Sequence, residues 1–263
     1  MNNQNRCRLC NGPASIQFSR KILSKYDVDY FRCGKCQSLQ TETPYWLDEA
    51  YGKENLSHLD TGSAQRNVNN LAACFLTSKI FNAKNVLDVG GGDGLLCRML
   101  RDHSINCFVK DRYAKPTYAQ GFTEPDFETP DLLIGFEVLE HFPNPQVDLV
   151  SLFERSPKAL LLSTAIYSTQ ESNWWYLTPE SGQHVFFYSK TALNLIAESY
   201  GYTITLIGEY ILLTKSASKL RILLAKTLLS PQARRIAKAY IAFLPTPGVW
   251  NDYLHQIKVT RAS

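Results

Sequence analysis

The chain has 263 residues, of which 44% are hydrophobic and 20% are charged, and its formal net charge is +4. This composition is typical of a soluble globular protein, and the length accommodates one large α/β domain with small additions. No uncharged apolar run approaches the roughly 20 residues that span a bilayer, and the net charge is too small to indicate a nucleic-acid partner by itself. The polar first residues carry no secretory signal, so we expect a cytoplasmic protein.

Two cysteine pairs lie near the N-terminus, Cys7-x2-Cys10 and Cys33-x2-Cys36. In a reducing compartment, paired knuckles of this kind indicate a metal site rather than disulfides. Each knuckle brings two thiolates to one ion, and four sulfur ligands complete a tetrahedral Zn²⁺ with no open position for water. We therefore expect residues 1–45 to form a zinc ribbon with a structural zinc ion. The segment has too few apolar residues for a core, so metal binding would supply its folding energy.

The segment 46–82 has a helical pattern, and strands then alternate with helices. The predicted strands are Val86–Val89, Cys107–Val109, Asp131–Phe136 and Ala159–Thr164. The predicted helices are Leu95–Asp102, Gln146–Glu154 and Thr191–Tyr200. A final hairpin is predicted from Thr203–Ile207 and Tyr210–Leu213, and the stretch 112–130 is too short for a full strand–helix unit. This order predicts an α/β domain over residues 46–215 with a Rossmann-like, mostly parallel sheet that ends in an antiparallel hairpin.

Residues 216–263 form a basic tail with eight Lys or Arg residues and one acid. Within it, residues 217–244 have the pattern of two amphipathic helices. The second begins at Ser230-Pro231, a capping residue followed by a favoured first-turn proline. A basic amphipathic helix can lie on an anionic membrane surface, which would make the protein membrane-peripheral. Packing on the domain and dimerisation through this region are the alternatives.

The run Asp88–Gly94 is the most informative stretch, because it follows a predicted strand and opens a predicted helix. Glycine there permits unusual backbone angles and the close approach of a ligand. A dinucleotide fingerprint would need a third glycine at Leu95, and a nucleotide triphosphate loop would need Gly-Lys-Ser/Thr. The pattern that fits is an acid followed by three alternate glycines, namely Asp88, Gly90, Gly92 and Gly94. This pattern resembles motif I of the class I S-adenosylmethionine (SAM)-dependent methyltransferases, which implies that these residues bind SAM.

Two acidic positions follow later strands. Asp111 comes at the end of the second strand, where nucleotide folds place an acid that accepts hydrogen bonds from ribose hydroxyls. Glu137 opens the run Glu-Val-Leu-Glu-His after the strand that ends at Phe136. Together with Pro145, this run resembles the fourth-strand motif of small-molecule methyltransferases. The resemblance implies that Glu137 faces the cofactor, whereas the next two polar residues, Glu140 and His141, shape the start of a helix.

His184 is the candidate base. Its segment, Gly182–Ser189, resembles the Glu-His-x-x-Tyr-Phe-Ser motif of zinc-ribbon deoxysugar C-methyltransferases, in which the histidine serves as base. Gln183 stands where that family has the acid, so both O- and C-methylation stay open. A neutral histidine can deprotonate a hydroxyl or an acidic carbon near physiological pH.

Three further positions are weaker candidates. The long loop from Ser168 to Pro179 contains three adjacent aromatic residues, Trp174, Trp175 and Tyr176, which suit a substrate lid or equally a buried anchor. In the helical lead-in, Tyr51 and Arg66 lie where similar enzymes often contact the substrate or the cofactor carboxylate.

These features predict a zinc-ribbon methyltransferase that uses SAM and a structural Zn²⁺. Its expected acceptor is a small molecule, a sugar or sugar-linked metabolite such as a nucleotide sugar or glycan, and not a nucleic acid. One alternative is an RNA methyltransferase that uses the zinc ribbon for binding. Another is a non-catalytic cofactor-binding protein that docks through its basic tail.

Overall fold

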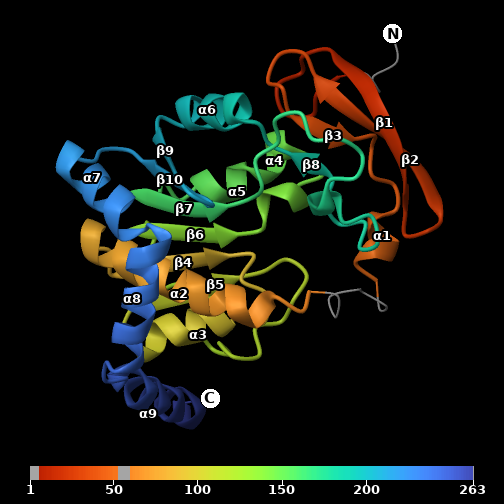
Figure 1. The fold of residues 1–263 in the computed structure, drawn as a ribbon. Coiled ribbons are helices and arrows are strands. Elements are labelled where there is room, and N and C mark those ends of the chain that lie inside the picture. The colour runs from red at the N-terminus through yellow and green to blue at the C-terminus, as the bar shows by residue number, and fades with distance from the viewer. Residues whose placement is uncertain (1–5, 53–59, 263) are drawn as a thin grey trace. The chain divides into compact units, whose positions relative to one another are not determined.

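A computed structural model describes residues 6–52 and 60–262, and this chain divides into two compact units (Figure 1). The first unit comprises Met1–Thr61, Glu137–Glu154 and Ser163–Ile204. The second unit comprises Gly62–Phe136, Arg155–Leu162 and Thr205–Ser263. Each unit is therefore assembled from segments that lie far apart in the sequence.

The second unit contains nearly all of a six-stranded sheet with the strand order β5-β4-β6-β7-β10-β9. The strands are β4 (Asn85–Val89), β5 (Asn106–Lys110), β6 (Leu132–Phe136), β7 (Ala159–Ser163), β9 (Thr203–Ile207) and β10 (Tyr210–Thr214). Strand β4 runs parallel to both β5 and β6, whereas the two-residue connection between the neighbouring strands β9 and β10 makes that pair antiparallel. Every residue of β7 and β10 is buried, as expected for a sheet covered on both faces. The predicted α/β fold with a terminal hairpin is confirmed.

Five helices accompany this sheet in the described part of the second unit. They are α2 (Ser63–Phe81), α3 (Leu95–Asp102), α7 (Lys219–Leu228), α8 (Pro231–Ala242) and α9 (Pro247–Ala262). Helix α2 lies against α3, α7 and α8, and Figure 1 shows α2 and α8 on the near side of the sheet. Helix α8 begins as predicted, with the Ser230 side chain accepting a hydrogen bond from the Ala233 amide.

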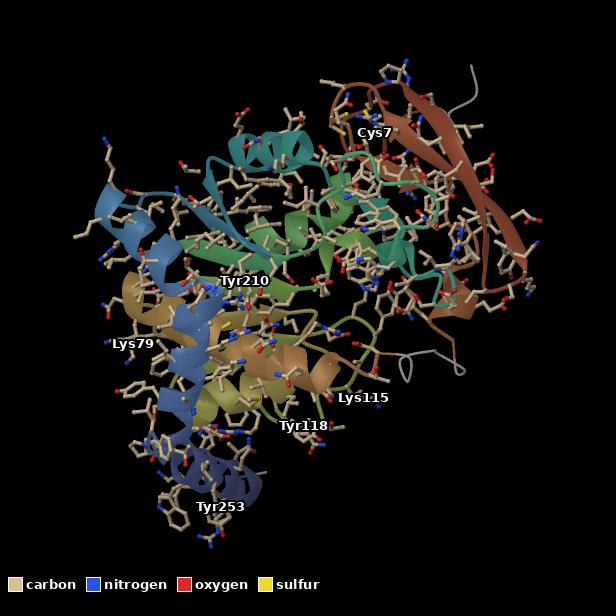
Figure 2. All side chains as sticks on the ribbon, viewed as in Figure 1. Cys7, Lys79, Lys115, Tyr118, Tyr210 and Tyr253 are labelled. Atoms are coloured by element: carbon tan, nitrogen blue, oxygen red, sulfur yellow. The ribbon has the colours of Figure 1, made fainter. Side chains whose placement is uncertain are left out.

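The buried side chain of Arg234 holds α8 against the turn of the β9–β10 hairpin. Arg234 donates to the hydroxyl of Tyr210 at 3.1 Å and pairs with Glu209 at 2.7 Å, and Figure 2 shows Tyr210 beside α8. One of the basic residues that made this helix appear amphipathic therefore serves to pack it on the domain. Among the described residues, no helix has the length and apolar character needed to cross a bilayer.

Helix α9 was not predicted from the sequence. It packs on α3 through an ion-pair network in which Asp252 meets Arg98 and Arg101, each at 2.7 Å. Its first turn comes very close to α3, because a Cβ atom on Gly248 would lie 1.7 Å from the carbonyl oxygen of Arg101. Both contacts join residues distant in sequence, so the local pattern gave no signal for them.

The first unit is built on a four-stranded antiparallel sheet with the order β1-β2-β3-β8. Its strands are β1 (Ala14–Ile22), β2 (Tyr26–Cys33), β3 (Leu39–Thr41) and β8 (Phe186–Phe187). Its helical segments are α1 (Leu47–Ala50), η3 (Leu139–His141), α4 (Pro145–Asp148), α5 (Val150–Phe153), η4 (Trp175–Leu177) and α6 (Lys190–Ser199). The last strand comes from a segment about 145 residues beyond β3 and completes the N-terminal sheet.

The expectation that the N-terminal residues lack an apolar core is wrong. Ile22, Val28, Tyr30 and Leu39 are buried in one cluster together with Trp46. Ala50 follows Trp46 closely, and the rest of this cluster comes from much later in the chain, namely Tyr167, Tyr176, Leu177, Val185 and Phe187. The N-terminal segment alone could not supply these partners, which is why its composition gave the wrong expectation.

Two predicted helices are interrupted. The segment 46–82 contains α1 and α2 separated by a turn at Tyr51 and Gly52 and by residues 53–59, which lie outside the described residues. The segment 146–154 is divided into α4 and α5 at Leu149, where an i to i+3 bond from the Leu152 amide shortens the turn. The stretch 112–130 contains neither helix nor strand, which confirms that this unit of the fold is reduced.

The substitution Gly248→Ala tests the packing of α9. The added methyl group would collide with backbone rather than with a flexible side chain, and overpacking of this kind lowers the free energy of unfolding by about 1–3 kcal/mol. Chemical denaturation should show this loss. The neighbouring exposed variant Val249→Ala is the control and should unfold like the wild type. Equal stability of both variants would contradict the observed docking of α9.

Candidate functional site

The glycine turn in the second unit follows β4 and leads into α3. Gly90, Gly92 and Gly94 have φ angles of +70°, +58° and +82°, a region that side chains disfavour. The Gly90 amide donates to the carbonyl of Lys110 at 2.7 Å, which fixes the start of the turn against the end of β5. A Cβ atom on Gly92 would meet nothing within 4 Å, so open space adjoins the turn there. The backbone is therefore shaped for the close approach of a ligand.

Gly91 is a further position of this turn that must be glycine, in addition to the three alternate glycines of the predicted motif. A Cβ atom there would lie 2.5 Å from Oδ2 of Asp88 and 2.7 Å from the side chain of Val109. Glycine is thus required at this position by space rather than by backbone angle. The motif of alternate glycines does not include this position. The unbroken run from Gly90 to Gly92 was the sequence feature that could have indicated it.

Asp88 has a buried carboxylate that lacks a full set of partners. The residue is 2% exposed, and its Oδ2 atom accepts no hydrogen bond from the residues that the structure describes. Burial, assisted by the negative charge of Asp111, raises the pKa of Asp88 to about 7. A buried carboxylate in this state is stabilised by a cationic ligand group, because such a group restores the charged form.

Asp111 is held by the backbone around it. Its Oδ2 accepts a hydrogen bond from the Gly92 amide at 2.9 Å, and its Oδ1 accepts from the amides of Tyr113 and Ala114 at 2.8 and 2.7 Å. A carboxylate offers about four lone-pair positions, of which these contacts use three. Asp111 therefore fixes the turn and keeps one acceptor position for a ligand hydroxyl.

These residues fit SAM. The ligand would bring an ammonium group for the unsatisfied Asp88 carboxylate, ribose hydroxyls for Asp111 and a shape that needs the close backbone of the turn. All of them belong to the second unit, whereas the predicted cofactor residue Glu137 and the candidate base His184 belong to the first.

Glu137 has a strained backbone, and each of its two carboxylate oxygens accepts one hydrogen bond. Its φ angle is +55°, which is uncommon for a residue other than glycine and is typical of functional positions. Its Oε1 accepts a hydrogen bond from the Ser163 hydroxyl at 2.7 Å, and its Oε2 accepts from the Tyr176 hydroxyl at 2.8 Å. Tyr176, named only as part of the aromatic loop, is 2% exposed and acts as an anchor.

His184 lies in a polar cluster of the first unit. Its Nδ1 is 2.7 Å from the carbonyl oxygen of Tyr176, so Nδ1–H is the donor and Nε2 carries the lone pair. Nε2 lies 3.9 Å from Oε1 of Glu140, a residue that is 0% exposed. Burial and the nearby Glu137 carboxylate raise the pKa of Glu140 to about 8. From the sequence, Glu140 is expected only to shape the start of a helix, whereas in the structure it lies beside His184.

His141 and Tyr51 complete this cluster. The ring centroids of His141 and His184 are 4.9 Å apart in an edge-to-face arrangement. The Tyr51 hydroxyl is 2.8 Å from Nδ1 of His141. Burial and the neighbouring His184 lower the pKa of His141 to about 3, so this imidazole is neutral. Arg66, the other weak candidate, lies in α2 of the second unit.

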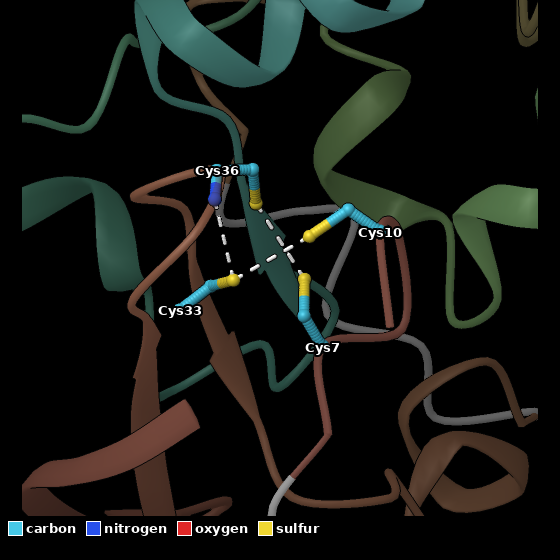
Figure 3. A group of neighbouring side chains, drawn as sticks. All are labelled: Cys7, Cys10, Cys33 and Cys36. Atoms are coloured by element: carbon cyan, nitrogen blue, oxygen red, sulfur yellow. Dashed lines mark hydrogen bonds between the residues drawn. The ribbon is translucent and has the colours of Figure 1, made fainter. Parts of the chain in front are cut away.

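The four paired cysteines are brought together in the first unit (Figure 3). Sγ of Cys7 is 3.6 Å from Sγ of Cys36, and Sγ of Cys10 is 3.5 Å from Sγ of Cys33. All four sulfur atoms lie within 4.8 Å of one another. Tetrahedral Zn–S bonds of about 2.3 Å place sulfur atoms roughly 3.8 Å apart, so this donor set and spacing fit a zinc ion.

Comparison with known proteins supports the prediction that the chain contains a methyltransferase domain. A family model described as a methyltransferase domain matches residues 50–207, which is more than half of the chain. No curated protein matches the sequence significantly.

Several solved structures are similar at low sequence identity. Magnesium protoporphyrin IX methyltransferase from Synechocystis PCC 6803 with bound SAH is 16% identical, with a TM-score of 0.44 over 65% of this chain and 93% of that chain. An O-methyltransferase family protein from Burkholderia thailandensis is 16% identical, with a TM-score of 0.45 over 65% of this chain and 64% of that chain. Human N-acetylserotonin methyltransferase in complex with SAM is 15% identical, with a TM-score of 0.41 over 62% of this chain and 55% of that chain.

The family model covers both the glycine turn and the polar cluster around His184. The chain therefore belongs to the methyltransferase-domain family.

Proposed function

We propose that this methyltransferase acts on a small-molecule acceptor, a sugar or a sugar-linked metabolite, and that His184 activates that acceptor. The observation that carries the proposal is the cluster of the buried Glu140 with the half-buried His141 and His184, which provides polar groups for an acceptor hydroxyl within an aromatic surround. The surround includes Tyr176, whose ring centroid is 4.6 Å from that of His184.

The cofactor residues are assigned from the geometry of the second unit. We assign Asp88 to the ammonium group of SAM, Asp111 to a ribose hydroxyl, and Gly90, Gly92 and Gly94 to close backbone approach. Glu137 retains lone pairs beyond its two hydroxyl donors, so it can accept a further hydrogen bond from the cofactor. When bound, SAM supplies a methyl group on a positively charged sulfonium, and the protein contributes mainly the alignment of the acceptor for in-line attack.

The proposal of a sugar acceptor is supported by the aromatic residues in the loop from Ser168 to Pro179. Trp175 is 74% exposed and its ring centroid is 5.2 Å from that of Tyr176. An exposed indole near this half-buried polar cluster offers a stacking surface for a sugar ring. Nε2 of His184 is the atom that we assign to activation of the acceptor, because the contact from Nδ1 to the carbonyl of Tyr176 fixes the tautomer.

We also propose that the four paired cysteines bind one structural zinc ion. Four sulfur ligands leave no open position for chemistry. The amides of Lys35 and Cys36 lie 3.3 and 3.4 Å from Sγ of Cys33, and such contacts stabilise thiolate ligands.

The variant Asp88→Asn tests the cofactor assignment. Loss of the negative charge that faces the ammonium group should weaken SAM binding at least tenfold, or about 1.4 kcal/mol, as measured by calorimetry on the full chain. Asp93→Asn, an exposed acid in the same turn, is the matched control and should bind SAM nearly as the wild type does. Equal affinity of both variants and the wild type would remove Asp88 from the site.

The same variant has a second readout in the absence of SAM. Because the folded protein raises the pKa of Asp88 from the ordinary value near 3.9 to about 7, its contribution to stability is full below about pH 4 and is lost as the pH rises through about 7. The melting temperature of Asp88→Asn should therefore gain on that of the wild type between about pH 4 and pH 7. A constant difference would show that Asp88 is not held in an unsatisfied state.

The variant His184→Ala tests the acceptor assignment. A screen of methyl transfer to nucleotide sugars, glycans and RNA would first identify the acceptor. His184→Ala should then lower turnover by about 100-fold or more, with less than a twofold change in SAM affinity. His255→Ala, an exposed histidine of α9, is the control. Wild-type turnover of His184→Ala would refute the activating role, and transfer to RNA alone would refute the small-molecule acceptor.

Zinc content tests the cysteine site. The purified protein should hold about one zinc ion per chain in this site, and Cys33→Ser should lower both the zinc content and the melting temperature, because metal binding contributes to folding. Cys74→Ser, in α2 of the second unit, should keep its zinc. A fully folded wild-type protein without metal would overturn the zinc assignment.

A further inference from the structure

The polar cluster around Glu140 has the composition of a second metal site. Glu140 and His141 are adjacent on η3, and His184 immediately precedes the Val185 that leads into β8. One ligand atom from each of the three residues lies within 4.8 Å of the other two. A cation about 2.1 Å from each atom would hold them roughly 3–3.5 Å apart, so modest side-chain rotation closes the site.

Each imidazole is oriented by a hydrogen bond at its Nδ1 atom, which is how the second ring nitrogen of a metal-bound histidine is usually held. The Nδ1–H group of His184 donates to the carbonyl of Tyr176, which turns Nε2 toward Glu140. The Tyr51 hydroxyl holds Nδ1 of His141 at 2.8 Å. These two partners come from different segments of the first unit, so the orientation of the rings does not arise from local sequence alone.

Glu140 supplies the strongest reason to expect a ligand. Its side chain is fully buried, and neither carboxylate oxygen accepts a well-formed hydrogen bond from the residues that the structure describes. The 3.9 Å separation from Nε2 of His184 is too long for a direct hydrogen bond. A buried carboxylate without partners is costly, and a cation coordinated by it would satisfy both its charge and its lone pairs.

We infer that Glu140, His141 and His184 bind one divalent transition-metal cation, distinct from the zinc ion of the four cysteines. Two imidazole nitrogens and one carboxylate oxygen suit a first-row ion and leave coordination positions open. The inference rests on the proposed function and deepens it, because His184 then activates the acceptor by holding the cation. The acceptor hydroxyl on the cation loses its proton to water as the new oxygen–methyl bond forms and the carbon–sulfur bond of SAM breaks.

Manganese binding to the zinc-loaded full chain tests the site. Mn²⁺ favours nitrogen and oxygen ligands over thiolates, so electron paramagnetic resonance should count one bound Mn²⁺ per chain without disturbing the cysteine site. Glu140→Gln and His184→Ala should each weaken this binding at least tenfold. His255→Ala should bind Mn²⁺ as the wild type does. Zinc content and SAM affinity, measured on the same samples, verify that each variant is folded.

Absence of Mn²⁺ binding, or equal binding by the wild type and both cluster variants, would overturn the cation site. Methyl transfer that persists after removal of all metal except the cysteine zinc would also overturn it and leave the proposed function standing. Conversely, cluster-dependent Mn²⁺ binding by a protein that methylates no small molecule would refute the proposed acceptor and leave the cation site in place.

Discussion

The backbone of Val185 is the point on which the arrangement of the first unit depends. Its carbonyl accepts hydrogen bonds from the buried guanidinium of Arg8 at 2.6 Å and from the amide of Thr41 at 3.1 Å, while its own amide donates to the carbonyl of Glu140 at 2.9 Å. Arg8 lies between the first two cysteines in the sequence, and His184 directly precedes Val185. The first cysteine knuckle is therefore linked to the segment of His184 through the Arg8 side chain and the Val185 backbone, and a zinc ion bound by the cysteines would act on the proposed acceptor site without touching it.

Each unit also contains one buried carboxylate that the described protein does not satisfy. Asp88 beside the glycine turn and Glu140 beside the histidines both have raised pKa values, and burial is the main cause in each case. Such groups destabilise the unliganded fold and are stabilised by cationic partners. A sulfonium cofactor with an ammonium group suits the first, and a divalent cation suits the second. Ligand binding is thus coupled to the stability of the protein as well as to its chemistry.

The sequence predicted the parts of the molecule whose signals are local. The alternate glycines from Gly90 to Gly94, the strand–helix alternation and the cap at Ser230 all follow from patterns within a few residues, and the structure contains each of them. What the sequence could not show depends on pairing over long distances. The addition of β8 to the N-terminal sheet and the docking of α9 through Asp252 are contacts of this kind.

In the candidate site, too, the features with a local sequence pattern were predicted and those that depend on long-range contacts were not. Glycine spacing indicated the cofactor turn, but the need for Gly91 depends on the space beside Asp88, which only the folded chain reveals. Likewise, the resemblance around His184 drew attention to one histidine, whereas its relation to Glu140, Tyr176 and Tyr51 arises from segments up to about 130 residues away.

The most direct test of the central claim is a crystal structure of the full chain with S-adenosylhomocysteine at saturating concentration. We expect the ligand to occupy the turn after β4, with a ribose hydroxyl within hydrogen-bonding distance of Asp111 and the amino group beside Asp88. Binding of the ligand at another site, with the turn after β4 left empty, would show that Asp88, Asp111 and the glycine turn do not form the cofactor site.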